Sequence, residues 1–83
     1  MSADVHGTSK AAQIVRGLGG DANILDLEPC ITRLRVEVVE AGLVDVRALR
    51  AAGAVAVVTS GNAVQVVVGP EADTLASDIE DLR

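Results

Sequence analysis

The stretch LEPCITRLRVEV, from Leu27 to Val38, holds the only cysteine of the chain and two arginines close behind it. Alternate residues of a β-strand lie on one face about 7 Å apart, so the side chains of Arg33 and Arg35 could both bind one anion. Cationic neighbours favour the nucleophilic thiolate form of a cysteine such as Cys30. Guanidinium groups also bind phosphate through paired hydrogen bonds. The residue types and their spacing therefore predict a thiol that accepts and holds a phosphoryl group.

The turn around the cysteine is expected to add backbone donors. Pro29 before it and a strand after it should hold the thiol near the surface, where the amide N–H groups of residues 31–33 can form an anion-binding concavity. Phosphoryl transfer mainly requires that the reacting groups are positioned and that their charge is stabilised, and these groups can do both. The residues alone leave a second interpretation open. A lone cysteine is often a packing residue. Arginines that alternate along a strand often form a solvated face, and here Glu37 and Glu40 would balance their positive charge.

Residue patterns predict three helices around this stretch. The first is capped by Thr8 or Ser9 and stops at Gly19–Gly20, and a short second helix has Asp45 as its cap. The last helix starts with Pro70 at its favoured first position. The first and last helices each carry one apolar stripe for a core. The stripes consist of Ala11, Ile14, Val15 and Leu18 in the first helix, and of Ala72, Leu75, Ala76, Ile79 and Leu82 in the last.

Four strands are expected, at about residues 24–28, 32–39, 54–59 and 63–68. Pro29 ends the first because it lacks an amide donor. A tight hairpin turn joins the last two, with Gly61 and Asn62 tolerating positive φ. The second strand alternates between a face with Thr32, Leu34, Val36 and Val38 and a face with Ile31, Arg33, Arg35 and Glu37. The order α-β-β-α-β-β-α favours an α+β fold in which three helices cover one face of a four-stranded antiparallel sheet.

The length, charge and composition of the chain limit which kinds of protein it can be. Eighty-three residues allow a single domain over residues 1–83, of which residues 1–7 are expected to be disordered. A net charge of −5 and the absence of aromatic rings disfavour nucleic-acid binding. No stretch has the pattern of a signal peptide or a membrane span, and one cysteine cannot form an internal disulfide, so the cytosol is expected. His6 and Cys30 are too few ligands for a metal site, and neither a metal nor a cofactor is expected.

Four segments together resemble the IIB domain of the bacterial phosphoenolpyruvate-dependent sugar phosphotransferase system. The resemblance is to the superfamily that handles glucose, N-acetylglucosamine and glucosides, and it covers roughly residues 10–82. The combination is specific, whereas a lone Cys-Ile-Thr would not be. The segments are GLGGDANI from Gly17 to Ile24, CITRLRVEV from Cys30 to Val38, LRAAGAVAVV from Leu49 to Val58 and AVQVVVGPEAD from Ala63 to Asp73.

The resemblance implies a phosphocysteine mechanism. A phosphohistidine of a IIA protein donates its phosphoryl group to the residue that matches the phosphorylated cysteine of the family, Cys30. The phosphocysteine then passes the group to a sugar, glucose or N-acetylglucosamine, bound in the membrane-embedded IIC permease. Arg33 and Arg35 match the arginine pair that the family uses in this onward transfer, and Thr32 is a further candidate for a hydrogen bond to the phosphate. The resemblance thus implies a cytoplasmic transferase component that meets the inner face of the membrane through IIC.

Two other functions fit the same residues. The chain could be a regulatory module with the same fold, whose phosphorylation controls a protein contact. It could also be a plain α+β domain with an inert cysteine, which a slow reaction of the thiol with a probe at neutral pH would indicate. The carrier itself fits either a free-standing subunit or a domain of a fused protein.

Overall fold

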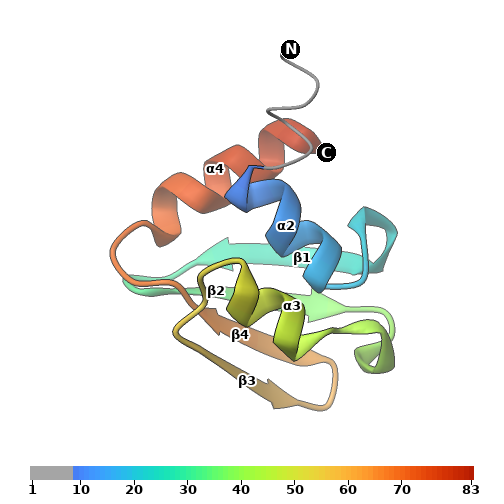
Figure 1. Ribbon diagram of the computed structural model, residues 1–83. Coiled ribbons are helices and arrows are strands. Elements are labelled where there is room, and N and C mark those ends of the chain that lie inside the picture. The colour runs from blue at the N-terminus through green and yellow to red at the C-terminus, as the bar shows by residue number, and fades with distance from the viewer. Residues whose placement is uncertain (1–8) are drawn as a thin grey trace.

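Three α-helices lie on one face of a four-stranded antiparallel sheet (Figure 1). The computed structural model describes residues 9–83; Thr8, His6 and the segment 1–7 that was predicted to be disordered lie outside them. The predicted order of elements and their one-sided arrangement are confirmed. The elements are α2 (Lys10–Gly17), the 3₁₀ turn η1 (Asp21–Asn23), β1 (Ile24–Pro29), β2 (Arg33–Val38), η2 (Ala41–Leu43), α3 (Val46–Ala51), β3 (Ala56–Ser60), β4 (Ala63–Val67) and α4 (Ala72–Leu82).

Side-chain caps fix where the first two of these helices begin. The Ser9 hydroxyl accepts a hydrogen bond from the amide of Ala12 at 3.1 Å, and the Asp45 carboxylate caps α3 in the same way. Gly19 and Gly20 follow α2 with φ of 103° and 98°, values that favour glycine, so the predicted stop is confirmed. No helix within residues 9–83 has the length and apolar content that a membrane span needs.

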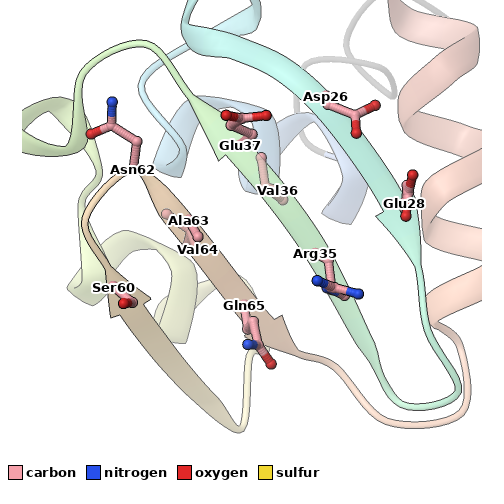
Figure 2. Close-up of a pocket in the computed structure, with 10 residues that line it drawn as sticks. All are labelled: Asp26, Glu28, Arg35, Val36, Glu37, Ser60, Asn62, Ala63, Val64 and Gln65. Atoms are coloured by element: carbon pink, nitrogen blue, oxygen red, sulfur yellow. The ribbon is translucent and has the colours of Figure 1, made fainter.

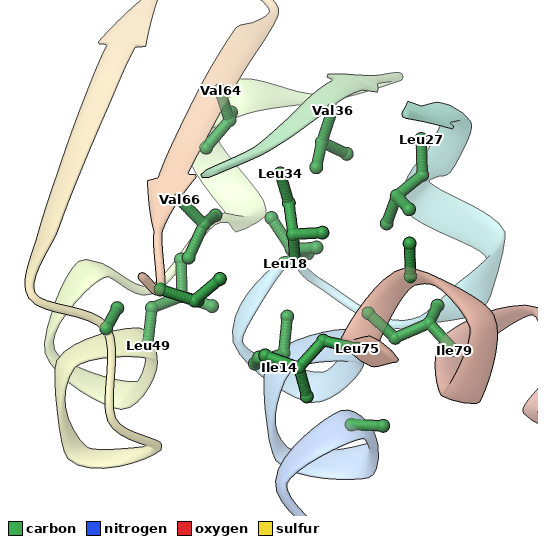
Figure 3. Packing of buried hydrophobic residues seen from close by; sticks show 14 of the residues in the cluster. Ile14, Leu18, Leu27, Leu34, Val36, Leu49, Val64, Val66, Leu75 and Ile79 are labelled. Atoms are coloured by element: carbon green, nitrogen blue, oxygen red, sulfur yellow. The ribbon is translucent and has the colours of Figure 1, made fainter. Parts of the chain in front are cut away.

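The sheet order β1-β2-β4-β3 joins the two hairpins through β2 and β4. The predicted alternation in β2 is confirmed, because Leu34, Val36 and Val38 are buried under the helices. Val64 and Val66 of β4 continue this apolar layer, and the helices cover it (Figure 3). The fully buried helix residues include Ile14 of α2, Leu49 of α3, and Ala72 and Ile79 of α4. The other face of the sheet is therefore the one that carries Arg33, Arg35 and Glu37.

The last helix differs from the prediction at both ends. α4 starts at Ala72 with Glu71 as its N-cap, so Pro70 precedes the helix instead of occupying its first position. The reason is Gly69, whose φ of 84° turns the chain between β4 and α4 before helical conformation begins. Leu82 was predicted to be buried but is 40% exposed, because it lies in the last turn and lines an open groove between α4 and the start of α2.

Two turn residues also differ from the prediction. In the β3–β4 hairpin only Gly61 has positive φ, at 58°, and Asn62 does not. A two-residue hairpin turn of type II′ needs positive φ at its first position alone. Thr32 was placed on the buried face of the second strand, but it is exposed and lies in the β1–β2 turn. Its carbonyl accepts from the amides of Val68 and Gly69, which ties this turn to the segment after β4.

Candidate functional site

Cys30 lies in the turn that follows β1. Its amide donates to the carbonyl of Arg33 at 2.7 Å, which closes the turn. The free thiol is half-buried and lines a shallow surface hollow of about 400 Å³. The remaining lining residues are Pro29, Ile31, Pro70 and Asp73. The hollow therefore leaves one face of the thiol open to a second molecule.

The connection between β4 and α4 holds the cysteine turn in place. The carbonyl of Thr32 accepts hydrogen bonds from the amides of Val68 at 3.0 Å and Gly69 at 2.9 Å. These two bonds tie a turn near the middle of the chain to the start of α4. The same connection brings Pro70 and Asp73 to the edge of the hollow. The wall opposite Cys30 is thus built by residues far from it in sequence.

The cysteine turn also presents unused backbone donors. Within residues 9–83, the amides of Ile31 and Thr32 have no hydrogen-bond acceptor. Both follow directly after Cys30, and both side chains are exposed. Successive amides in such a turn can bind the oxygens of an anion. These two donors are the part of the predicted anion-binding concavity that is free of protein partners.

The two arginines lie on the open face of the sheet. Arg33 donates from Nη1 to Oε1 of Gln65 at 2.5 Å. Arg35 stands directly opposite Glu28 on one side and Gln65 on the other, and its side chain is exposed (Figure 2). It has no hydrogen bond or ion pair within the described part of the chain. Both guanidinium groups therefore have access to solvent on the face opposite the helices.

The sheet face forms a hollow separate from that of the thiol. This second hollow has a volume of about 420 Å³ and includes Arg35, but not Cys30. Three acidic side chains, Asp26 and Glu28 of β1 and Glu37 of β2, line this hollow together with the arginine (Figure 2). Among the predicted site residues, the structure brings Cys30 and Thr32 together in one turn. It places the side chains of Arg33 and Arg35 on the adjoining strand, outside the cysteine hollow.

Gln65 is a member of this arrangement that the sequence analysis missed. It is half-buried on β4 between β2 and β3, and its amide oxygen fixes the position of the Arg33 guanidinium. The available signal was a single polar side chain in the run AVQVVV. An isolated amide in an apolar strand indicates a hydrogen-bond partner on the same sheet face, since a buried polar group without one is costly.

A protein-family comparison identifies relatives of this chain. Residues 12–45 match the family model described as "phosphotransferase system, EIIB". This range includes Cys30 and both arginines. One relative, the "PTS system N-acetylglucosamine-specific EIIB component" of Streptomyces coelicolor, is 57% identical over 74 residues, which cover 89% of this chain and 96% of that protein.

Longer relatives contain the same domain as a small part. The "PTS system glucose-specific EIICBA component" of Staphylococcus saprophyticus is 47% identical over 66 residues, which cover 80% of this chain and 10% of that protein. This chain thus spans about a tenth of that fused relative. Among solved structures, one domain of the PTS system IIabc component from Clostridium difficile superimposes with a TM-score of 0.76 and 20% identity. The superposition covers 88% of this chain and 78% of that one, which supports the fold.

Proposed function

This chain belongs to the EIIB family of the phosphotransferase system, and we propose that it carries phosphoryl groups in sugar uptake on Cys30. The donor is a phosphohistidine of a IIA protein, and the acceptor is a sugar bound by a IIC permease in the membrane. The relative that is 57% identical is named as specific for N-acetylglucosamine, which favours this sugar over glucose. The observation that carries the proposal is the single thiol, open to a shallow hollow beside two unused amides.

The proposed loading step exchanges one bond to phosphorus for another. The thiolate of Cys30 attacks the phosphorus, a sulfur–phosphorus bond forms, and the nitrogen–phosphorus bond of the phosphohistidine breaks. The imidazole of the donor leaves with the bonding electron pair and takes up a proton. In the second step, a sugar hydroxyl attacks the same phosphorus and Cys30 leaves as thiolate. The sugar hydroxyl releases its proton to solvent. Each step thus transfers one phosphoryl group without loss.

The groups around Cys30 have distinct roles in this proposal. The amides of Ile31 and Thr32 donate to the phosphoryl oxygens and hold the phosphocysteine in one orientation. The carboxylate of Asp73 lines the same hollow and repels the phosphate, which limits the stability of the phosphocysteine and favours its onward transfer. Arg33 and Arg35 act on the neighbouring sheet face, where the complex with IIC brings sugar and phosphate together. The chain works on the cytoplasmic side, bound to the membrane through IIC.

A mass measurement tests the proposed function. The chain is incubated with a phosphorylated IIA protein, and its intact mass is compared with that of a sample given unphosphorylated IIA. We expect a gain of one phosphoryl group, which fragmentation assigns to Cys30. An unchanged mass with a donor that loads other EIIB proteins, or a phosphoryl group on another residue, would show that the proposal is wrong.

Substituting an arginine should separate the two transfer steps. In Arg35→Gln we expect delivery to the sugar to fall by on the order of a hundred-fold, because a charged donor to the transferring group is lost. Loading from IIA should stay within about three-fold, since the guanidinium lies outside the cysteine hollow. Loading is followed by mass, and delivery by sugar phosphate formed with IIC-containing vesicles. Arg47→Gln, at an exposed position of α3, is the matched control and should change neither rate. Equal losses of both steps in Arg35→Gln would contradict the assignment.

A further inference from the structure

We propose that the free edge of β3 pairs antiparallel with β3 of a second copy of this chain, giving a two-fold symmetric dimer with one continuous sheet. The sheet order β1-β2-β4-β3 leaves β3 with a neighbour on one side only (Figure 1). Its pairing with β4 is regular from Ala56 to Ser60, without a bulge. A regular outer strand exposes a row of amide and carbonyl groups that can pair with another strand.

The β3 edge lacks the features that normally protect an outer strand. No Asp, Glu, Lys or Arg occurs between Arg50 and Glu71. Val58 on the open face of β3 is 51% exposed, and Val55, just before the strand, is 71% exposed. Exposed valine side chains thus lie along this edge. Charges, prolines and bulges are the usual protection against strand pairing, and β3 has none of them.

The opposite edge of the sheet, at β1, is protected in several ways. Its pairing with β2 shifts register between Ile24 and Asp26, and the strand ends in Pro29. The guanidinium of Arg83 donates from Nη2 to the carbonyl of Ile24 at 3.1 Å, which occupies a backbone acceptor there. Each molecule therefore offers one free edge. Pairing of two such edges closes a dimer and leaves no edge for a third copy.

Charge favours a second copy as the occupant of the β3 edge. The chain has a net charge of −5, so most of its surface repels another copy. The exposed side of α4 is acidic through Asp73, Asp78, Glu80 and Asp81. The β3 edge is instead neutral, so two copies can meet there without opposing like charges. Antiparallel pairing about a two-fold axis at the strand centre places β-branched side chains opposite each other, an arrangement that stabilises sheets.

The small contact predicts a weak dimer. Pairing along a five-residue strand buries less than the roughly 1,200 Å² that marks the lower limit of standard stable interfaces. We therefore expect a dissociation constant of about 0.1–1 mM, which corresponds to about 4.1–5.5 kcal/mol of association free energy. The contact lies outside the cysteine hollow, so the inference does not depend on the proposed function.

Sedimentation velocity over a concentration series up to about 1 mM tests the dimer. The full chain should shift from monomer towards dimer, with no larger species. Val58→Lys places two ammonium groups near the two-fold axis and should weaken association at least ten-fold. Leu25→Lys, at the protected β1 edge and 60% exposed, is the matched control and should associate as the unaltered chain does.

Three outcomes would overturn the proposal. They are a purely monomeric chain throughout the series, growth beyond the dimer, or equal weakening by Val58→Lys and Leu25→Lys. Thermal melting of both variants checks that the fold is retained. Hydrogen exchange of the unaltered chain gives a test without substitution. Those amides of residues 56–60 that face away from β4 should exchange more slowly as concentration rises, and unchanged rates would also count against pairing.

Discussion

Replacing Cys30 by serine is expected to abolish phosphoryl uptake from a phosphorylated IIA protein. Serine has nearly the same shape, so the turn closed by the bond between the amide of residue 30 and the Arg33 carbonyl should persist. A hydroxyl is a far weaker nucleophile than a thiolate unless a base activates it. We expect the loading rate to fall on the order of a thousand-fold or more, the scale seen when an enzyme loses its nucleophile. Intact-mass spectrometry against time measures the loss.

Two controls make the Cys30→Ser result specific. The melting temperature of the variant should match that of the unaltered chain, because the side chain is only half-buried and makes no disulfide. Alkylating the thiol of the unaltered chain should block loading as completely as the substitution does. A serine variant that loads at the unaltered rate would assign the phosphoryl group to another residue and end the phosphocysteine proposal.

The local parts of the fold were predictable from sequence because they depend on short-range patterns. The two-residue period of β2 correctly separated Leu34, Val36 and Val38 from the arginines. Caps at Ser9 and Asp45 correctly placed the starts of α2 and α3. Errors occurred where a neighbouring backbone conformation decided the outcome. Gly69 delays the start of α4, and a single positive φ at Gly61 suffices for the last hairpin.

The candidate site was predictable as a set of residues but not as an arrangement. Spacing placed Arg33 and Arg35 on one strand face, and the structure has them there. The spacing could not predict where that face lies relative to the thiol, because the turn after Pro29 decides which way Cys30 faces. The pairing of β2 with β4 brings Gln65 to Arg33 across 32 positions of sequence. A contact of this kind depends on the order of strands in the sheet, which local periodicity does not encode.

For the proposed function, this separation explains how one carrier would serve two partners. The thiol has its own hollow, with Pro70 and Asp73 as the opposite wall, and the arginines lie on the sheet face. A donor needs access to the thiol alone. An acceptor complex that also covers the sheet face would bring the arginines into the transfer. The geometry therefore supports different arginine requirements for loading and delivery, which the Arg35→Gln comparison measures.

At the other end of β1, a buried polar residue links several elements of the fold. Asn23 is 3% exposed. Its Nδ2 donates to the carbonyl of Leu18 at 2.7 Å and to that of Glu40 at 3.1 Å, and its Oδ1 accepts from the amide of Glu40 at 2.9 Å. The side chain thereby joins the end of α2 to the segment after β2. Gly19 packs so closely that a Cβ there would lie 2.6 Å from this amide nitrogen.

Replacing Asn23 by leucine is expected to lower the free energy of unfolding by about 3 kcal/mol or more. The near-isosteric side chain leaves the buried carbonyl of Leu18 and the partly buried carbonyl and amide of Glu40 without partners. Each unsatisfied buried group costs about 1–3 kcal/mol. For a domain of this size, a loss of 3 kcal/mol lowers the melting temperature by about 12–24 °C. Thermal and urea unfolding measure both quantities.

Asn62→Leu is the matched control for the Asn23 prediction. Asn62 is exposed, and its side-chain hydrogen bond to the carbonyl of Val39 is long at 3.3 Å. Its substitution should cost less than about 1 kcal/mol, because water replaces the lost partner. The folded fraction of Asn23→Leu should still load Cys30, since the two residues lie near opposite ends of β1. Equal destabilisation by the two variants would show that the buried amide does not hold these elements together.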